Sequence, residues 1–83
     1  MLKVDSHAGD VFDVLLAELP ALVARAEVPR LTGGTIASRT LANLDSMGRG
    51  PAGRFQCGGK TIYPRETLVS WLRARARPAG ATK

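Results

Sequence analysis

The first run of apolar positions along this chain lies between residues 10 and 19 and has a helical spacing. Its members are three or four residues apart, namely Val11, Val14, Leu15 and Leu19. This spacing predicts a short amphipathic helix with those side chains on one face and Asp10 as its N-cap. Pro20 ends the helix, because the residue before a proline avoids helical angles. The next segment, Ala21-Leu22-Val23, is predicted to be a short strand.

A pair of helices joined by a glycine turn is predicted in the middle of the chain. The first is expected to start near Ala24 or Arg25, or one or two residues later so that Pro29 falls in its first turn. It ends at Gly33-Gly34, which can turn the chain sharply. The second helix follows Ile36, with Ala37 or Ser38 as its cap, and Ser38 has the better capping chemistry.

The second helix of the pair has one apolar stripe and one polar face. The inner stripe is predicted to consist of Ala37, Leu41, Leu44 and Gly48. The residues left outside are Arg39, Thr40, Asn43, Ser46 and Met47. A glycine- and proline-containing loop with Arg49 follows. The exposed face is therefore polar and carries a positive charge.

Two β-prone runs, over residues 54–57 and 61–63, flank a Gly-Gly tip and predict a hairpin. Its inner side is expected to include Phe55, Cys57, Ile62 and Tyr63, with Cys57 as a small buried residue. Pro64 then opens a last helix that runs to Arg77 and is ended by Pro78. Its apolar face is Leu68, Val69, Trp71 and Leu72. Trp71, Phe55 and Tyr63 are expected in the core.

This order of elements predicts a mainly α fold with a small β-hairpin, of the winged helix-turn-helix class, with an extra N-terminal helix. We expect residues 1–21 to be an acidic segment with the short helix, residues 22–77 to be the DNA-binding domain and residues 78–83 to be a flexible tail. A chain of 83 residues forms one domain with a small core, so a deep catalytic cavity is not expected.

The charge is distributed unevenly along the chain. Residues 1–29 hold two Lys or Arg against five Asp or Glu, a net charge of −3, whereas residues 30–83 hold ten against two, a net charge of +8. This asymmetry favours a polyanionic partner for the second part of the chain. The arginines are spread over helix, loop and hairpin, which argues against a membrane surface. With no long apolar run, we expect a cytoplasmic, nucleoid-associated protein.

Catalytic and metal chemistry find little support in the composition. A single cysteine and a single histidine allow neither an internal disulfide nor a Cys/His zinc site, and we expect no metal and no cofactor. Gly53 lies one residue too far from Gly59-Lys60-Thr61 for a phosphate-binding loop. Neither His7 nor Cys57 has a catalytic partner nearby in the sequence. We therefore do not expect an enzyme.

The residues expected to contact double-stranded DNA are Ser38, Arg39, Thr40, Asn43, Arg49, Arg54 and Lys60. Arg can bind guanine and Asn can bind adenine with two hydrogen bonds each, and Thr can contact a phosphate or a thymine methyl. Residues 49, 54 and 60 supply phosphate contacts from the loop and the hairpin. Arg73, Arg75 and Arg77 are secondary, non-specific candidates. Taken alone, the polar helix face is more typical of an ordinary solvated surface, and it is the context of the neighbouring elements that favours DNA contact.

From about Leu22 to Arg77 the chain resembles the small excisionase-like and AlpA-like proteins, relatives of the MerR winged-helix DNA-binding domain. The resemblance rests on Ser38-Arg39-Thr40-Leu41, Gly48-Arg49-Gly50-Pro51, Gly58-Gly59-Lys60 through Tyr63, and Leu68 to Leu72. It implies a recognition helix in the major groove, a wing on the flanking backbone or in the minor groove, and a role in bacterial phages or mobile elements. Pro29 and the longer turn Gly33-Gly34-Thr35-Ile36 depart from the family pattern.

The N-terminal helix lies outside the resemblance and leaves two alternatives. Its apolar face either completes the core or pairs with a second copy, which would give a homodimer or a cooperative oligomer on DNA. A different function is also open: an adaptor that docks a recombinase, an RNA polymerase or a packaging enzyme through this helix. The main expectation is an excisionase-like recombination factor or a small transcriptional regulator.

Overall fold

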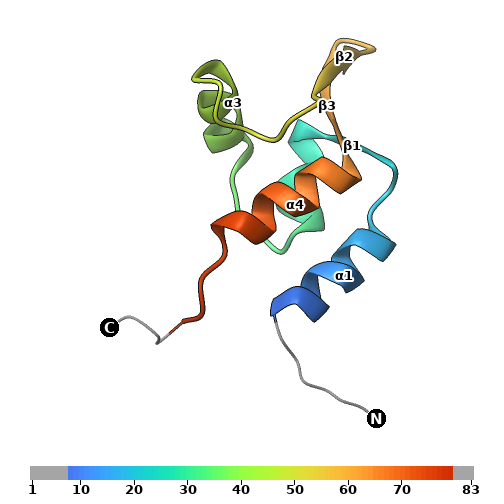
Figure 1. Cartoon of the computed structure of the whole chain (residues 1–83). Coiled ribbons are helices and arrows are strands. Elements are labelled where there is room, and N and C mark those ends of the chain that lie inside the picture. Colours follow the sequence, from blue (N-terminus) through green and yellow to red (C-terminus); the bar gives the residue numbers. More distant parts are fainter. Residues whose placement is uncertain (1–7, 80–83) are drawn as a thin grey trace.

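The structure, a computed structural model, describes residues 8–79, which form four α-helices, one turn of 3-10 helix and a three-stranded antiparallel sheet (Figure 1). The coarse prediction of a mainly helical chain with a hairpin is therefore confirmed. The elements in chain order are α1 (Ala8–Glu18), β1 (Leu22–Ala24), η1 (Arg25–Glu27), α2 (Val28–Leu31), α3 (Ser38–Ser46), β2 (Phe55–Cys57), β3 (Lys60–Pro64) and α4 (Arg65–Arg75).

Helix α1 packs against α4 and joins the core through a face that keeps the predicted Leu15 and Leu19 but is rotated away from Val11 and Val14. The helix begins at Ala8, so Asp10 lies inside it and is not its N-cap. The side chains turned inward are Phe12, Leu15, Leu16 and Leu19. Val11 and Val14, predicted on the buried face, are 64% and 57% exposed. The observed stripe has the same spacing and includes the phenylalanine, so it buries more apolar area.

The first helix of the central pair is divided in two. Residues 25–27 form the 3-10 turn η1, and α2 follows with Pro29 in its first turn, which is the alternative position predicted from the sequence. Val28 is fully buried and anchors α2 in the core. The predicted single helix from Ala24 or Arg25 was therefore wrong, because a proline is tolerated only near the start of a helix.

Helix α3 begins where it was predicted to begin, and its cap is the first of the two predicted candidates. Ala37 is the N-cap residue, and Ser38, which has the better capping chemistry, is already the first helical residue. No side chain caps this end. The buried Ile36 fixes the register, because the chain leaves it in an extended conformation at Ala37 and can become helical only from Ser38 onward.

The hairpin β2–β3 is present, and β1 adds a third strand that pairs with β3, in the order β1-β3-β2. Gly58 and Gly59 have φ values of 61° and 79°, so they form the two-residue turn whose twist suits a hairpin. Phe55 and Cys57, expected on the inner side, are both exposed. Strand β2 is an edge strand that pairs only with β3, so its side chains gain little cover from the helices.

Helix α4 follows Pro64 as predicted but ends at Arg75, two residues before the expected end. The residue preceding Pro78 avoids helical angles, so the helix cannot reach Arg77. The buried core contains residues from α2, α3, α4, β1 and β3, together with one residue after α1 and one before α3, namely Leu19, Val23, Val28, Ile36, Leu41, Tyr63, Leu68, Val69 and Leu72. Trp71, expected in this core, is only half-buried at its edge.

Candidate nucleic-acid interface

Helix α3 and the β2–β3 hairpin project from the same end of the molecule (Figure 1). A groove of about 440 Å³ lies between the start of α3 and the hairpin tip. Its lining residues are Ala24, Arg25, Ala26, Ser38, Arg39, Ala42, Gly59, Lys60 and Thr61. Three predicted site residues, Ser38, Arg39 and Lys60, are thus brought together although they come from two separate elements.

The remaining predicted site residues lie around this groove rather than in it. Thr40 and Asn43 are exposed on α3 but do not line the groove. Arg49 is exposed in the loop after α3, at the opposite end of that helix from Arg39. The groove lining contains no carboxylate and three cationic side chains, of which Arg25 is paired with a carboxylate behind it, so Arg39 and Lys60 give the groove its net positive charge.

Directly behind the groove, a buried carboxylate connects three elements. Asp45 on α3 is only 4% exposed. Its Oδ2 accepts hydrogen bonds from Arg25 Nη2 at 2.7 Å and from the Tyr63 hydroxyl at 2.5 Å. Arg25 Nε also donates to the Tyr63 hydroxyl oxygen at 3.1 Å. These three side chains, which we call the Asp45 network, hold η1, α3 and β3 in one arrangement.

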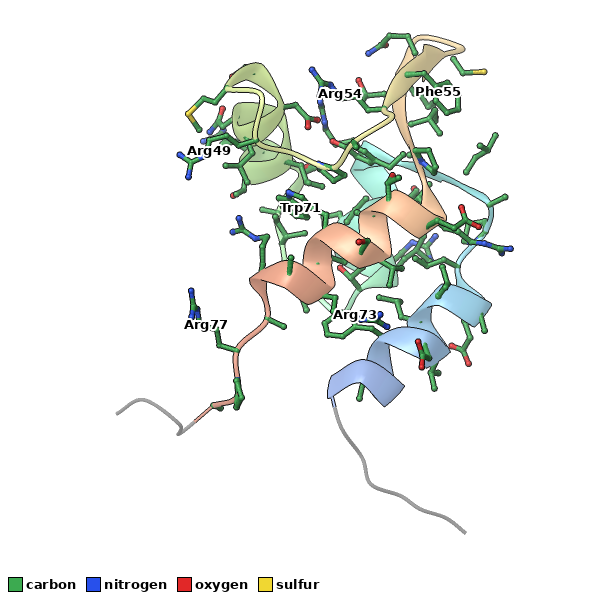
Figure 2. All side chains as sticks on the ribbon, viewed as in Figure 1. Arg49, Arg54, Phe55, Trp71, Arg73 and Arg77 are labelled. Carbon is green, nitrogen blue, oxygen red and sulfur yellow. The ribbon has the colours of Figure 1, made fainter. Side chains whose placement is uncertain are left out.

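Arg54, predicted to contact phosphate, is turned toward the Asp45 network instead. Its Nη2 donates to the backbone carbonyl oxygen of Asp45 at 3.3 Å, and its Nη1 lies 3.9 Å from Asp45 Oδ1. Figure 2 shows its side chain between α3 and the hairpin. The Arg54 side chain remains 43% exposed, so it contacts α3 from the edge of the network.

The loop over residues 48–53 closes on the same carboxylate. A Cβ atom at position 50 would lie 1.8 Å from Asp45 Oδ1, so only glycine fits beside the carboxylate. The loop is held from the other side by Trp71, whose indole N–H donates to the Arg49 carbonyl oxygen at 2.9 Å (Figure 2). This contact explains why the indole lies at the edge of the core: a half-buried tryptophan keeps a partner for its N–H. Within the loop, the side chain of Pro51 is fully buried.

The Asp45 network changes the acid–base properties of its members. Burial, followed by the hydrogen bond to Asp45, raises the pKa of Tyr63 above its ordinary value of 10.0. Hydrogen bonds to Tyr63 and to Asp45 raise the pKa of Arg25 as well. Tyr63 is therefore neutral and Arg25 is cationic at neutral pH, which is the state in which both can donate to the carboxylate.

The raised pKa of Tyr63 predicts an alkaline loss of stability. A tyrosine whose pKa rises on folding contributes stability that is fully present below the unfolded-state value of 10.0 and is lost as pH rises through the higher folded-state value. We expect Tyr63→Phe to be less stable at neutral pH but to show a flatter decline above pH 10. Thermal unfolding of both proteins from neutral to alkaline pH measures this difference. Parallel curves would show that Tyr63 does not titrate with unfolding.

Two members of this arrangement, Arg25 and Asp45, were not among the predicted site residues. Asp45 lies four residues after Leu41, which is fully buried, and this spacing places both on the same face of α3. A carboxylate at such a position needs a charged or hydrogen-bonding partner. That signal was available in the sequence, whereas the identity of the partners depends on contacts 18 and 20 residues away along the chain.

Other kinds of site find no support in the described part of the chain. Between residues 8 and 79, no three His, Cys, Asp or Glu side chains are grouped as a metal site would require. None of the helices in that range is long and apolar enough to cross a membrane. Comparisons with protein-family models, with curated proteins and with solved structures find no match.

Proposed function

We propose that this chain binds double-stranded DNA and distinguishes between base sequences, as a winged helix-turn-helix protein. In this proposal α2 and α3 are the helix pair, α3 enters the major groove and the β2–β3 hairpin is the wing that contacts the flanking backbone. The observation that carries the proposal is the positive groove between α3 and the hairpin tip, which joins Arg39 to Lys60 across two elements.

The proposed contacts suit the exposed side chains. Arg39, Thr40 and Asn43 are exposed on α3 and have the chemistry to read base edges in a major groove. Within residues 8–79, neither Arg39 nor Lys60 takes part in an ion pair, so both are available to a ligand. Arg49 supplies a further phosphate contact beyond the end of α3. Arg54 is assigned a supporting role, because its guanidinium faces Asp45.

Two biological roles use this same set of contacts: an excisionase-like recombination factor and a small transcriptional regulator. Both follow from the resemblance of residues 22–77 to excisionase-like and AlpA-like proteins. They differ in the target site and in how strongly the DNA is bent. Measuring the bend angle on the selected site separates them, because an architectural recombination factor must deform its DNA.

The function is tested by binding to a pool of random duplexes, followed by alanine substitution at the two ends of the groove. Arg39→Ala is expected to reduce the preference for the selected site by about 1–3 kcal/mol, because a base contact is lost. Lys60→Ala is expected to weaken binding equally on selected and random DNA and to lower the salt slope by about one unit, because a phosphate contact is lost. Fluorescence anisotropy at several salt concentrations measures both effects.

Arg77→Ala is the matched control for the loss of one positive charge. Arg77 is exposed beyond the end of α4, and its side chain points away from the body of the protein (Figure 2). We expect this variant to bind selected DNA nearly as tightly as the unchanged chain. An equal loss of DNA affinity in all three variants would show that binding depends only on the net charge of the protein. No selection of any sequence from the pool would exclude the proposed function.

A further inference from the structure

Helix α1 and the end of α4 lie at the end of the molecule opposite α3 and the hairpin (Figure 1). They line an apolar groove that shares no residue with the proposed DNA surface. It has a volume of about 500 Å³ and lies between α1, α2 and the end of α4. Its main apolar lining residues are Val11, Phe12, Leu15, Leu31, Ile36 and Leu72. Thr32, Thr35, Ala76 and the basic side chain of Arg75 make up the rest of the lining.

The outer face of α1 continues this apolar surface. Val11 lines the groove and is 64% exposed, and Val14, one helical turn further on, is 57% exposed. Exposed apolar side chains are unremarkable when they are scattered singly, but a stripe beside an apolar groove indicates an interaction surface. The core contacts of α1 are made by the adjoining face, with Phe12, Leu15 and Leu16, so the exposed stripe is left for an external partner.

The charges beside the groove indicate which partner fits. Helix α1 contains Asp10, Asp13 and Glu18 and no basic residue, whereas residues 67–79 contain Arg73, Arg75 and Arg77 and no acidic residue. Within one chain the two helices are already joined by Arg73, which binds Asp13 at 2.9 Å and lies over the Phe12 ring (Figure 2). An acidic helix with an apolar stripe is thus the kind of segment that the end of α4 binds.

We propose that the groove is occupied by α1 of a second copy of this chain, in a two-fold symmetric dimer. Val11 and Val14 of each copy enter the groove of the other, and the acidic residues of each α1 approach Arg75 of the other. Two-fold symmetry uses the same surface on both copies and closes the assembly at two chains. Both α3 helices stay uncovered, because they lie at the far end of each copy (Figure 1).

The test measures the association of the full chain without DNA, so that its failure is independent of the proposed DNA binding. Sedimentation velocity across the micromolar range should show a concentration-dependent dimer. Val14→Glu should weaken the dimer by roughly 10- to 100-fold, because the two-fold axis places two buried charges in the interface. Arg75→Glu should weaken it as well, by placing an acid opposite the acidic residues of the other copy.

Leu22→Glu is the matched control. Leu22 is 55% exposed, nearly as much as Val14, and does not line the groove. This variant should dimerise like the unchanged chain, and circular dichroism should show that all variants remain folded. A chain that stays monomeric throughout the micromolar range would overturn the proposal and leave the groove to a different protein. An equal loss of association in the Val14 and Leu22 variants would also overturn it.

Discussion

Replacement of Asp45 with alanine is expected to lower the free energy of unfolding by about 2–3 kcal/mol. The change removes the acceptor of the Tyr63 hydroxyl and the counter-charge of Arg25, and it leaves the fully buried Tyr63 hydroxyl with a single partner. In a domain of this size the loss corresponds to a decrease in melting temperature of about 10–20 °C. Thermal and urea unfolding monitored by circular dichroism measure it.

Asp45→Asn separates the charge of the side chain from its shape. The amide retains an oxygen that can accept from Tyr63 but cannot neutralise Arg25, so we expect about half of the loss seen with alanine. Glu27→Ala is the control for an ordinary ion pair, because Glu27 binds Arg30 at an exposed position where such pairs contribute little. Equal stability of Asp45→Ala and Glu27→Ala would show that the Asp45 network does not stabilise the fold.

The Asp45 network also bears on the proposed DNA surface. Asp45 is on α3, Tyr63 is on the strand that leads away from the hairpin tip, and Arg25 lines the groove between them. The relative position of Arg39 and Lys60 therefore depends on a contact that neither residue makes. Under conditions in which Asp45→Asn remains folded, we expect it to bind selected DNA more weakly, since the two parts of the surface are no longer held in one arrangement.

Local sequence signals were sufficient to predict the hairpin, the position of α3 and the start of α4. Gly58-Gly59 between two β-prone runs specifies a tight turn on its own, and Pro64 suits the position just before a helix. The outer face of α3 was also predicted correctly. Leu41 identifies the inner face, and the helical period then places the remaining residues of the helix relative to it. These features depend on residues that are close together in the chain.

Features set by tertiary contacts could not be predicted in this way. In α1, two apolar stripes with helical spacing overlap, and packing against α4 selects the one that contains Phe12 over the one that contains Val11 and Val14. Cys57 and Phe55 are exposed on the edge strand β2. The alternation of residues in this strand does not show whether a helix covers either of its faces. Arg54 was assigned to DNA because its charge was visible, whereas its partner Asp45 is nine residues away.

Gly50→Ala is expected to destabilise the protein by about 2 kcal/mol, although the backbone at this position does not require glycine. An added Cβ would lie 1.8 Å from Asp45 Oδ1 and 2.9 Å from its Cγ, so either the carboxylate or the loop must move. A moved carboxylate weakens the hydrogen bonds from Tyr63 and Arg25, and a moved loop disturbs the buried Pro51. Urea unfolding of the variant measures the loss.

The decisive comparison places the same substitution in the Asp45→Ala background. There the clashing carboxylate is absent, so Gly50→Ala should be neutral or slightly stabilising, by up to about 0.5–1 kcal/mol, because alanine reduces the entropy of the unfolded chain. Gly48→Ala is the control: Gly48 has a φ of 73° and no atom within 4 Å of an added Cβ, so its cost is backbone strain and should be the same in both backgrounds. If Gly50→Ala still destabilised the protein in the Asp45→Ala background, glycine would be required by the loop backbone itself. If the destabilisation disappeared, glycine at position 50 would be required because the loop packs against the Asp45 carboxylate.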